Sequence, residues 1–191
     1  MNYYKIDSLE RYFKTYNKSV QDPEAFWGQL ADENFTWYQK WDKVLEYDMI
    51  GAKFTWFRNG KFNIVKNCID RHLNKRGDKI AIIFEPNNPN EPAQHITYLE
   101  LHERVCKMAN VLKEQGIQKG DRVCIYLPMI PELAVSLLAC ARVGAIHSVV
   151  FAGFSASALA SRIQDSGCKM VITSDGSYRG NKTIDLKGIV D

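Results

Sequence analysis

The chain has 191 residues, of which 46% are hydrophobic and 25% are charged, which is typical of a globular protein. Its net charge of +3 is small, its basic residues are scattered, and it has no helix-turn-helix, zinc-finger or RNA-recognition pattern, so we expect no nucleic-acid partner. The longest uncharged apolar stretch, 133–141, is too short to span a bilayer, so we expect no membrane partner.

The cysteine pattern and the N-terminal residues bear on the cellular compartment. The chain has five cysteines and no C-x-x-C pair, which argues against a zinc or thiol-redox motif. An odd count without disulfide spacing is typical of a reducing compartment. Residues 1–7 have neither a basic start nor an apolar run behind them, so they do not resemble a signal peptide. We therefore expect a cytoplasmic protein.

We expect residues 1–75 to form an aromatic-rich, irregular and partly helical segment. The run Asp22-Pro23-Glu24 predicts a helix start, because Asp can cap a helix and Pro is favoured at its first position. Further along, large aromatic residues continue in a polar background without a clear period: Trp37, Trp41, Phe54, Trp56 and Phe57. They either pack on a core of their own or anchor a segment that wraps around another surface.

Regular α/β structure is expected over residues 76–191. The apolar run 79–84 predicts a strand, the Pro- and Asn-rich stretch 86–92 a long turn, and 95–98 a second, antiparallel strand.

A capping box then predicts a long helix. Thr97 and Glu100 stand three residues apart, so that each side chain can bind the backbone N–H of the other residue. The helix has one apolar face, and Gly116 ends it. The apolar face carries Leu101, Val105, Met108, Ala109 and Leu112.

Strands and helices alternate after this point. Strands are predicted at 123–127, 146–151 and 170–173. Helices are predicted at Pro131–Val143 and 155–166, followed by Gly144 and Gly167. Short connections between such elements predict a βαβαβ unit with a parallel sheet and right-handed crossovers. The Pro131–Val143 helix is apolar nearly all round, so it should be buried on more than one side.

The chain stops at residue 191 without a turn signal or a polar tail. We take this as a sign of truncation, with the remainder of its own chain as a partner. The expected fold class is thus α/β, as an incomplete domain.

No residue of the chain is assigned a catalytic role. Neither a Ser/His/Asp nor a Cys/His signature occurs with recognisable spacing, and the glycine patterns of dinucleotide and P-loop sites are absent. The four histidines lie on different predicted elements without metal-ligand spacing, so we favour structural roles for them and expect no metal site.

Two loops should lie where parallel sheets bind ligands, beyond the carboxyl ends of strands. In 151–155, Gly153 would let a ligand approach the backbone, although by composition alone we favour a plain strand-to-helix turn. In 174–182, Arg179 and Lys182 flank Gly-Asn in what we expect to be a flexible basic loop. It is either a solvated surface loop or a phosphate site.

Several long runs, in the order in which they occur, resemble AMP-forming acetyl-CoA synthetases of the adenylate-forming superfamily. They are WFRNGKFN at 56–63, NCIDRHL at 67–73, ITYLELH at 96–102, KGDRVCIYLPMIPE at 119–132 and LACARVGAIHSVVF at 138–151. The resemblance covers the chain from about Asp22 to Asp191. The motif at 67–70 is more similar to acetate enzymes than to propionate enzymes.

The resemblance implies a two-step activity for the parent enzyme. Acetate attacks the α-phosphorus of ATP, with Mg²⁺ assisting, and gives acetyl-adenylate and pyrophosphate. The thiol of coenzyme A then displaces AMP to give acetyl-CoA. The resemblance also implies that residues 76–191 are the first part of the AMP-binding domain, and that 1–75 are an acetyl-CoA-synthetase-type N-terminal segment.

The same resemblance implies the binding residues. Arg179, Gly180, Asn181 and Lys182 stand where the family contacts the phosphate-bearing nucleotide end of coenzyme A, and Asn181 replaces a residue that is commonly Gly or Ala. Gly153 stands in a loop near the pantetheine region, in which Ala152 departs from the family's pattern.

The family's phosphate-cradling loop, its acid pocket and its catalytic lysine have no counterpart in these residues. We therefore expect this piece to be inactive alone. Two alternatives stay open: a ligase for propionate or another short acid, and a stand-alone coenzyme A or nucleotide-binding module.

Overall fold

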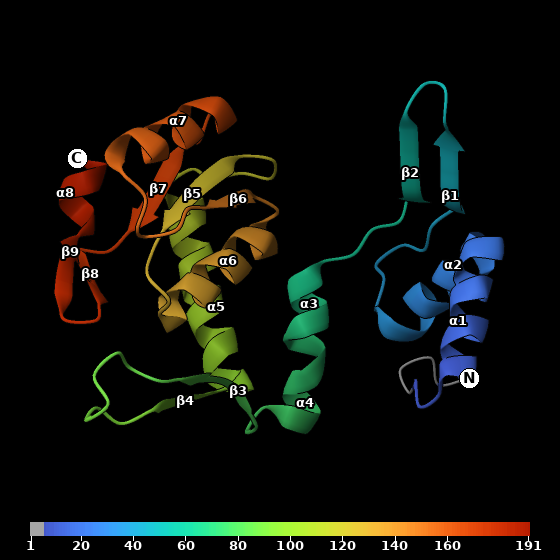
Figure 1. The fold of residues 1–191 in the computed structure, drawn as a ribbon, viewed down its shortest axis with the longest axis horizontal. Helices are drawn as coiled ribbons and strands as arrows, with labels where there is room; N and C mark the ends of the chain where they lie inside the picture. Colours follow the sequence, from blue (N-terminus) through green and yellow to red (C-terminus); the bar gives the residue numbers. More distant parts are fainter. Residues whose placement is uncertain (1–5) are drawn as a thin grey trace. The chain divides into compact units, whose positions relative to one another are not determined.

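A computed structural model describes residues 6–191; residues 1–5, part of the stretch judged unlike a signal peptide, lie outside it. The chain forms two compact units that divide between Phe62 and Asn63 (Figure 1). The functional division into 1–75 and 76–191 stays a prediction. Within 6–191, no helix is long and apolar enough to cross a membrane.

The first unit contains two helices and a hairpin: α1 (Leu9–Gln21), α2 (Pro23–Asn34), β1 (Lys43–Asp48) and β2 (Lys53–Arg58). The predicted helix start is confirmed, because Pro23 opens α2 and the Asp22 carboxylate accepts a hydrogen bond from the N–H of Ala25 at 3.2 Å. Phe26 and Ala31 are buried on this helix.

The expected aromatic-rich, partly helical segment is confirmed, but its residues 43–58 are not irregular, because β1 and β2 pair as an antiparallel hairpin. Leu45 pairs with Trp56, and Tyr47 pairs with Phe54 so that their rings stack at 6.4 Å. Such cross-strand pairs stabilise a hairpin. Large residues lie on both faces of β2, which hides the alternation that would have predicted a strand.

The antiparallel pair at the start of the second unit is confirmed as β3 (Ile80–Phe84) and β4 (Gln94–Thr97). It leads into α5 (Tyr98–Glu114), and the predicted capping box is present. Thr97 Oγ1 accepts from the N–H of Glu100 at 3.2 Å, and the Glu100 carboxylate accepts from the N–H of Thr97 at 2.8 Å. The helix is followed by Gly116, which has a φ of +80°.

The predicted parallel sheet is also confirmed, with strand order β6-β5-β7. Its strands are β5 (Arg122–Tyr126), β6 (Ile146–Val149) and β7 (Met170–Thr173), connected by α6 (Pro131–Val143) and α7 (Ala156–Ser166). Gly144 and Gly167 take left-handed conformations at the ends of the two helices, as expected of C-caps.

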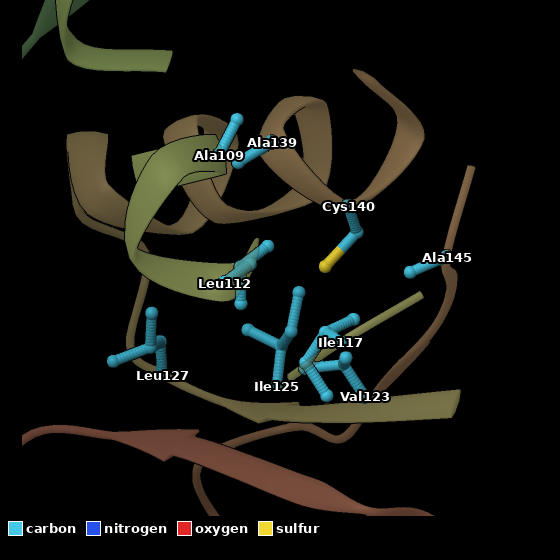
Figure 2. Close-up of a cluster of buried hydrophobic side chains, with 9 residues drawn as sticks. All are labelled: Ala109, Leu112, Ile117, Val123, Ile125, Leu127, Ala139, Cys140 and Ala145. Carbon is cyan, nitrogen blue, oxygen red and sulfur yellow. The ribbon is translucent and has the colours of Figure 1, made fainter. Parts of the chain in front are cut away.

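Central strand β5 is buried on both faces. Val123 and Ile125 pack toward α5 and α6 in one cluster, where Leu112 and Cys140 also lie (Figure 2). The alternating residues Cys124 and Tyr126 belong to a different cluster that includes Leu159 of α7. A strand covered on both faces is what a parallel sheet with helices on each side requires.

Helix α6 is buried on two sides, as its apolar sequence predicts. Ala139 and Cys140 belong to the cluster on β5. Val135 belongs to another cluster with Ile69 and Val105. Part of the helix surface, including Leu133 and Leu137, is only half-buried.

Several short elements were not predicted: α3 (Ile64–Cys68), the 3₁₀ helix η1 (Asp70–His72), α4 (Leu73–Arg76), β8 (Gly176–Arg179), β9 (Lys182–Asp185) and α8 (Leu186–Val190). Each has three to five residues, and the helices among them are too short for a helical period to be recognised. The expected flexible loop at 174–182 is instead largely the β8–β9 hairpin.

Candidate functional site

The loop after β6 lies at the carboxyl edge of the sheet, and its shape is set by its own side chains. A Cβ on Gly153 would lie 2.5 Å from a ring carbon of Phe151, so any other residue here would displace that exposed ring. The loop is also tied to the sheet, because the hydroxyl of Tyr126 on β5 donates a hydrogen bond to the carbonyl of Phe154 at 2.8 Å. Burial raises the pKa of Tyr126, which favours the protonated donor.

Ser155 connects this loop to α7 and caps it, because its Oγ accepts from the N–H of Ala158 at 3.4 Å. On the same helix, the guanidinium of Arg162 lies 4.6 Å from the centre of the Phe154 ring. A ligand at the loop would therefore meet a helix start whose unpaired N–H groups favour negative charge.

The four other predicted site residues form the tip of the β8–β9 hairpin. Arg179 and Lys182 are direct cross-strand partners, joined by the two-residue turn Gly180-Asn181. Gly180 has a φ of +59° and Asn181 does not have a positive φ, the pattern of a type II′ turn with glycine first.

The two cations at the tip lie close together without a compensating acid. Directly paired residues place their side chains on one face of a ladder, about 4.5–5.5 Å apart at Cβ, and like charges in this arrangement destabilise it. Arg179 and Lys182 are both exposed, and within residues 6–191 neither forms an ion pair. The hairpin acid Asp185 lies at the other end, where it caps α8.

A contact that the sequence did not predict fixes the turn. The side-chain amide of Asn87, in the β3–β4 loop, donates to the carbonyl of Gly180 at 3.1 Å. Nothing in the sequence distinguishes Asn87 from its neighbour Asn88, because the contact joins residues 93 positions apart.

The tip carries one forked and one point-like cation on the same face, the two kinds of side chain that phosphate sites use. Its residues are brought together as the sequence predicts, whereas Gly153 lies on a different loop. No hydrogen bond joins the two loops in the described part of the chain.

A second polar constellation joins η1 to α5 and α6. The Asp70 carboxylate accepts from Arg142 Nη2 at 2.6 Å and from Nη1 at 3.2 Å. It also lies 3.1 Å from Nδ1 of His102. Asn63 adds a link to the end of α6, with its amide donating to the carbonyl of Ala141 at 3.1 Å. These residues come from three distant parts of the sequence, so spacing could not reveal them.

The chain matches two families of known proteins. Residues 69–190 match the family of AMP-binding enzymes, and residues 12–68 match the acetyl-coenzyme A synthetase N-terminus.

Individual relatives agree with these family matches. An acetyl-coenzyme A synthetase of Alkalilimnicola ehrlichii is 53% identical over 95% of this chain, and one of Syntrophobacter fumaroxidans is 56% identical over 93%. The solved structure of acetoacetyl-CoA synthetase from Streptomyces lividans superposes with a TM-score of 0.83 at 28% identity, over 91% of this chain. The chain spans only 28%, 27% and 26% of the lengths of these three proteins, respectively.

Proposed function

The chain belongs to the family of AMP-binding enzymes, and from this premise we propose that it is the N-terminal part of an AMP-forming acetyl-CoA synthetase. The observation that carries the proposal is 50–56% identity over nearly the whole chain to several proteins of that name. The match to the acetyl-coenzyme A synthetase N-terminus over residues 12–68 supports it separately.

The proposed reaction of the whole enzyme joins acetate to coenzyme A at the expense of ATP. Acetate would attack the α-phosphorus of ATP to form acetyl-adenylate and pyrophosphate. The thiol of coenzyme A would then attack the acetyl carbon and release AMP. Mg²⁺ supplies charge neutralisation on the phosphates when it is bound. Among residues 6–191 no group of three or more His, Cys, Asp or Glu side chains could hold a metal ion.

The part that this chain would play is coenzyme A binding. Arg179 and Lys182 would contact a phosphate at the nucleotide end, and Gly180 and Asn181 would form the turn between them. Gly153, in the loop after β6, would lie near the pantetheine part of coenzyme A. The repulsion between two paired cations supports this role, because a bound phosphate would relieve it. The glycine turn leaves the approach open, since nothing lies within 4 Å of a Cβ placed on Gly180.

The comparisons support acetate rather than acetoacetate as the acid. Identity to the acetyl-coenzyme A synthetases is 50–56%, against 28% to the acetoacetyl-CoA synthetase. A cytoplasmic location is supported by five free cysteines, which suit a reducing compartment.

The first experiment tests whether the 191-residue chain is inactive alone. The purified chain is incubated with acetate, ATP and Mg²⁺, and pyrophosphate is measured. We expect none, because the chain lacks the family's phosphate loop and catalytic lysine, which would stabilise the charge that develops in adenylation. Pyrophosphate release that scales with the chain concentration, and persists after repurification, would contradict this expectation.

The second experiment tests whether the chain is a competent part of the enzyme. The aligned 182 residues of the Alkalilimnicola ehrlichii protein are replaced by the corresponding residues of this chain. We expect the chimera to catalyse acetate-dependent ATP–pyrophosphate exchange and to form acetyl-CoA. Acetate, propionate and acetoacetate are compared as acids. A folded chimera that activates none of them would refute the proposed function.

A further inference from the structure

The sequence of the turn at the tip of the β8–β9 hairpin is compatible with two turn types. Types I′ and II′ both place the first central residue at positive φ, and they differ in the orientation of the peptide between the two central residues. In type I′ the second central residue also has a positive φ, which asparagine tolerates. Gly180-Asn181 can therefore form either turn. The structure contains type II′, because Asn181 does not have a positive φ.

Asn87 contacts the peptide group that distinguishes the two turns. Its side-chain amide donates to the carbonyl of Gly180 at 3.1 Å, and this carbonyl belongs to the peptide between Gly180 and Asn181. A carbonyl oxygen only accepts hydrogen bonds, so the contacting atom of the amide is its nitrogen, Nδ2. In a type I′ turn this peptide is reversed, and the carbonyl would point away from Asn87. The hydrogen bond is therefore specific for type II′.

The loop that carries Asn87 has hydrogen bonds of its own. The carbonyl of Asn88 accepts from the N–H of Glu91 at 3.0 Å, and Oδ1 of Asn88 accepts from the N–H of Asn90 at 3.1 Å. Pro86 restricts the backbone on the other side of Asn87. Asn87 is thus presented by a folded loop, which lowers the conformational entropy that is lost when its hydrogen bond to the turn forms.

The hairpin is weakly stabilised at its tip. Each strand has four residues, and a two-stranded hairpin of this kind is marginally stable in water. The directly paired cations Arg179 and Lys182 also repel each other. Within residues 6–191, the bond from Asn87 is the only hydrogen bond that links residues 178–183 to another part of the chain. The conformation of the tip before a ligand binds therefore depends on Asn87.

We propose that Asn87 is a positioning residue for coenzyme A binding: it selects the type II′ turn and so holds Arg179 and Lys182 in one arrangement before the phosphate binds. The inference rests on the proposed function, in which this tip binds the nucleotide end of coenzyme A. Asn87 acts through the turn, because its amide is bonded to the turn carbonyl. A tip that is ordered in advance loses less conformational freedom when its ligand binds, and this strengthens binding.

The first measurement is the KM for coenzyme A in the chimera with the Alkalilimnicola ehrlichii protein. Asn87→Ala should raise this KM about two- to fivefold, which corresponds to about 0.4–1 kcal/mol. The kcat should change less than the KM, because saturating coenzyme A itself orders the tip. Asn90→Ala is the matched control and should leave the KM unchanged. Asn90 is exposed in the same loop, and its side chain forms no hydrogen bond within residues 6–191.

A variant with the other turn type separates turn selection from any other role of Asn87. The double variant Gly180→Asn, Asn181→Gly has the central dipeptide that favours type I′. Its KM for coenzyme A should be raised, and the addition of Asn87→Ala should raise it no further, because the carbonyl no longer faces Asn87. Effects that multiply would show that Asn87 acts independently of the turn, and would overturn the proposal.

Amide hydrogen exchange reports the turn without depending on activity. In the chimera without ligand, peptides that cover residues 176–185 should exchange about two- to fivefold faster in Asn87→Ala than in the unsubstituted chimera. Asn90→Ala should exchange at the unsubstituted rate. Saturating coenzyme A should remove the difference between Asn87→Ala and the unsubstituted chimera, because the bound phosphate then orders the tip.

Three further results would overturn the proposal, and they differ in what they mean for the proposed function. If Arg179→Ala raises the KM for coenzyme A and Asn87→Ala does not, the tip binds coenzyme A but Asn87 does not position it. If neither variant raises the KM in an active chimera, the coenzyme A site is wrongly assigned and the inference fails with it. Equal exchange at residues 176–185 with and without Asn87→Ala would show that Asn87 does not fix the turn.

Discussion

Replacing Asp70 by asparagine tests how much the polar junction of η1, α5 and α6 stabilises the second unit. The amide side chain would keep the shape and one acceptor oxygen of the carboxylate but would lose the charge that faces Arg142. The guanidinium would then be left largely buried without its counter-charge, since the Arg142 side chain is only 22% exposed. Its Nε is already a buried atom without a hydrogen-bond partner.

The magnitude follows from the exposure of the pair. Exposed ion pairs contribute about 0–1 kcal/mol, and breaking a fully buried pair costs about 3–5 kcal/mol. Asp70 and Arg142 have side-chain exposures of 29% and 22%, which places this pair between the two limits. We expect Asp70→Asn to cost about 1.5–3 kcal/mol, which is also the range of charge-assisted hydrogen bonds.

Hydrogen exchange measured by mass spectrometry detects this loss of stability in individual helices. Peptides of α5 and α6 should lose about tenfold to a hundredfold in protection, at about 1.4 kcal/mol per tenfold. Lys187→Gln is the matched control in the same unit, because it breaks an exposed pair with Asp191 and should cost about 0–0.5 kcal/mol. Equal losses in the two variants would refute the reasoning. So would a double Asp70→Leu, Arg142→Leu variant that is less stable than Asp70→Asn.

Three further predictions concern the hairpin and the sheet. Gly180→Ala should cost about 1 kcal/mol in a denaturant titration, because φ is +59° there while open space surrounds the position. Two hydrogen bonds hold the pKa of Asp121 below its ordinary value of 3.8. The larger effect comes from the Lys169 side chain and the smaller from the backbone N–H of Gln118. The stability from Asp121 is therefore present above that pH and lost below it, and Asp121→Asn should flatten the acid limb of a pH–stability curve. In the active chimera, Arg179→Ala should raise the KM for coenzyme A about three- to thirtyfold without changing ATP–pyrophosphate exchange.

Each of these three predictions has an outcome that contradicts it. An unchanged Gly180→Ala midpoint would mean that the turn is not formed in solution. A steep acid limb that persists in Asp121→Asn would assign the pH dependence to other carboxylates. Slower adenylation in Arg179→Ala, with an unaltered coenzyme A dependence, would remove this residue from the coenzyme A site.

The sequence alone was sufficient for the parallel-sheet unit. Its helices α5, α6 and α7 have 17, 13 and 11 residues, and caps such as Thr97, Ser155 and Gly144 mark their ends. These signals are local, because a capping side chain or a left-handed glycine acts within one turn of its own position. The hairpin of β1 and β2 was not predicted because it lacks such a local signal. Large residues lie on both faces of β2, so its sequence shows no alternation.

The tertiary structure alone decided which residues meet. The sequence singled out Arg179 and Lys182, but only strand pairing showed that they share a face. The contacts of Asn87 with Gly180, and of Asp70 with Arg142 and His102, join residues 93, 72 and 32 positions apart. Such pairs leave no period or spacing in a single sequence, because the polar groups are brought together by the packing of the helices and strands that carry them.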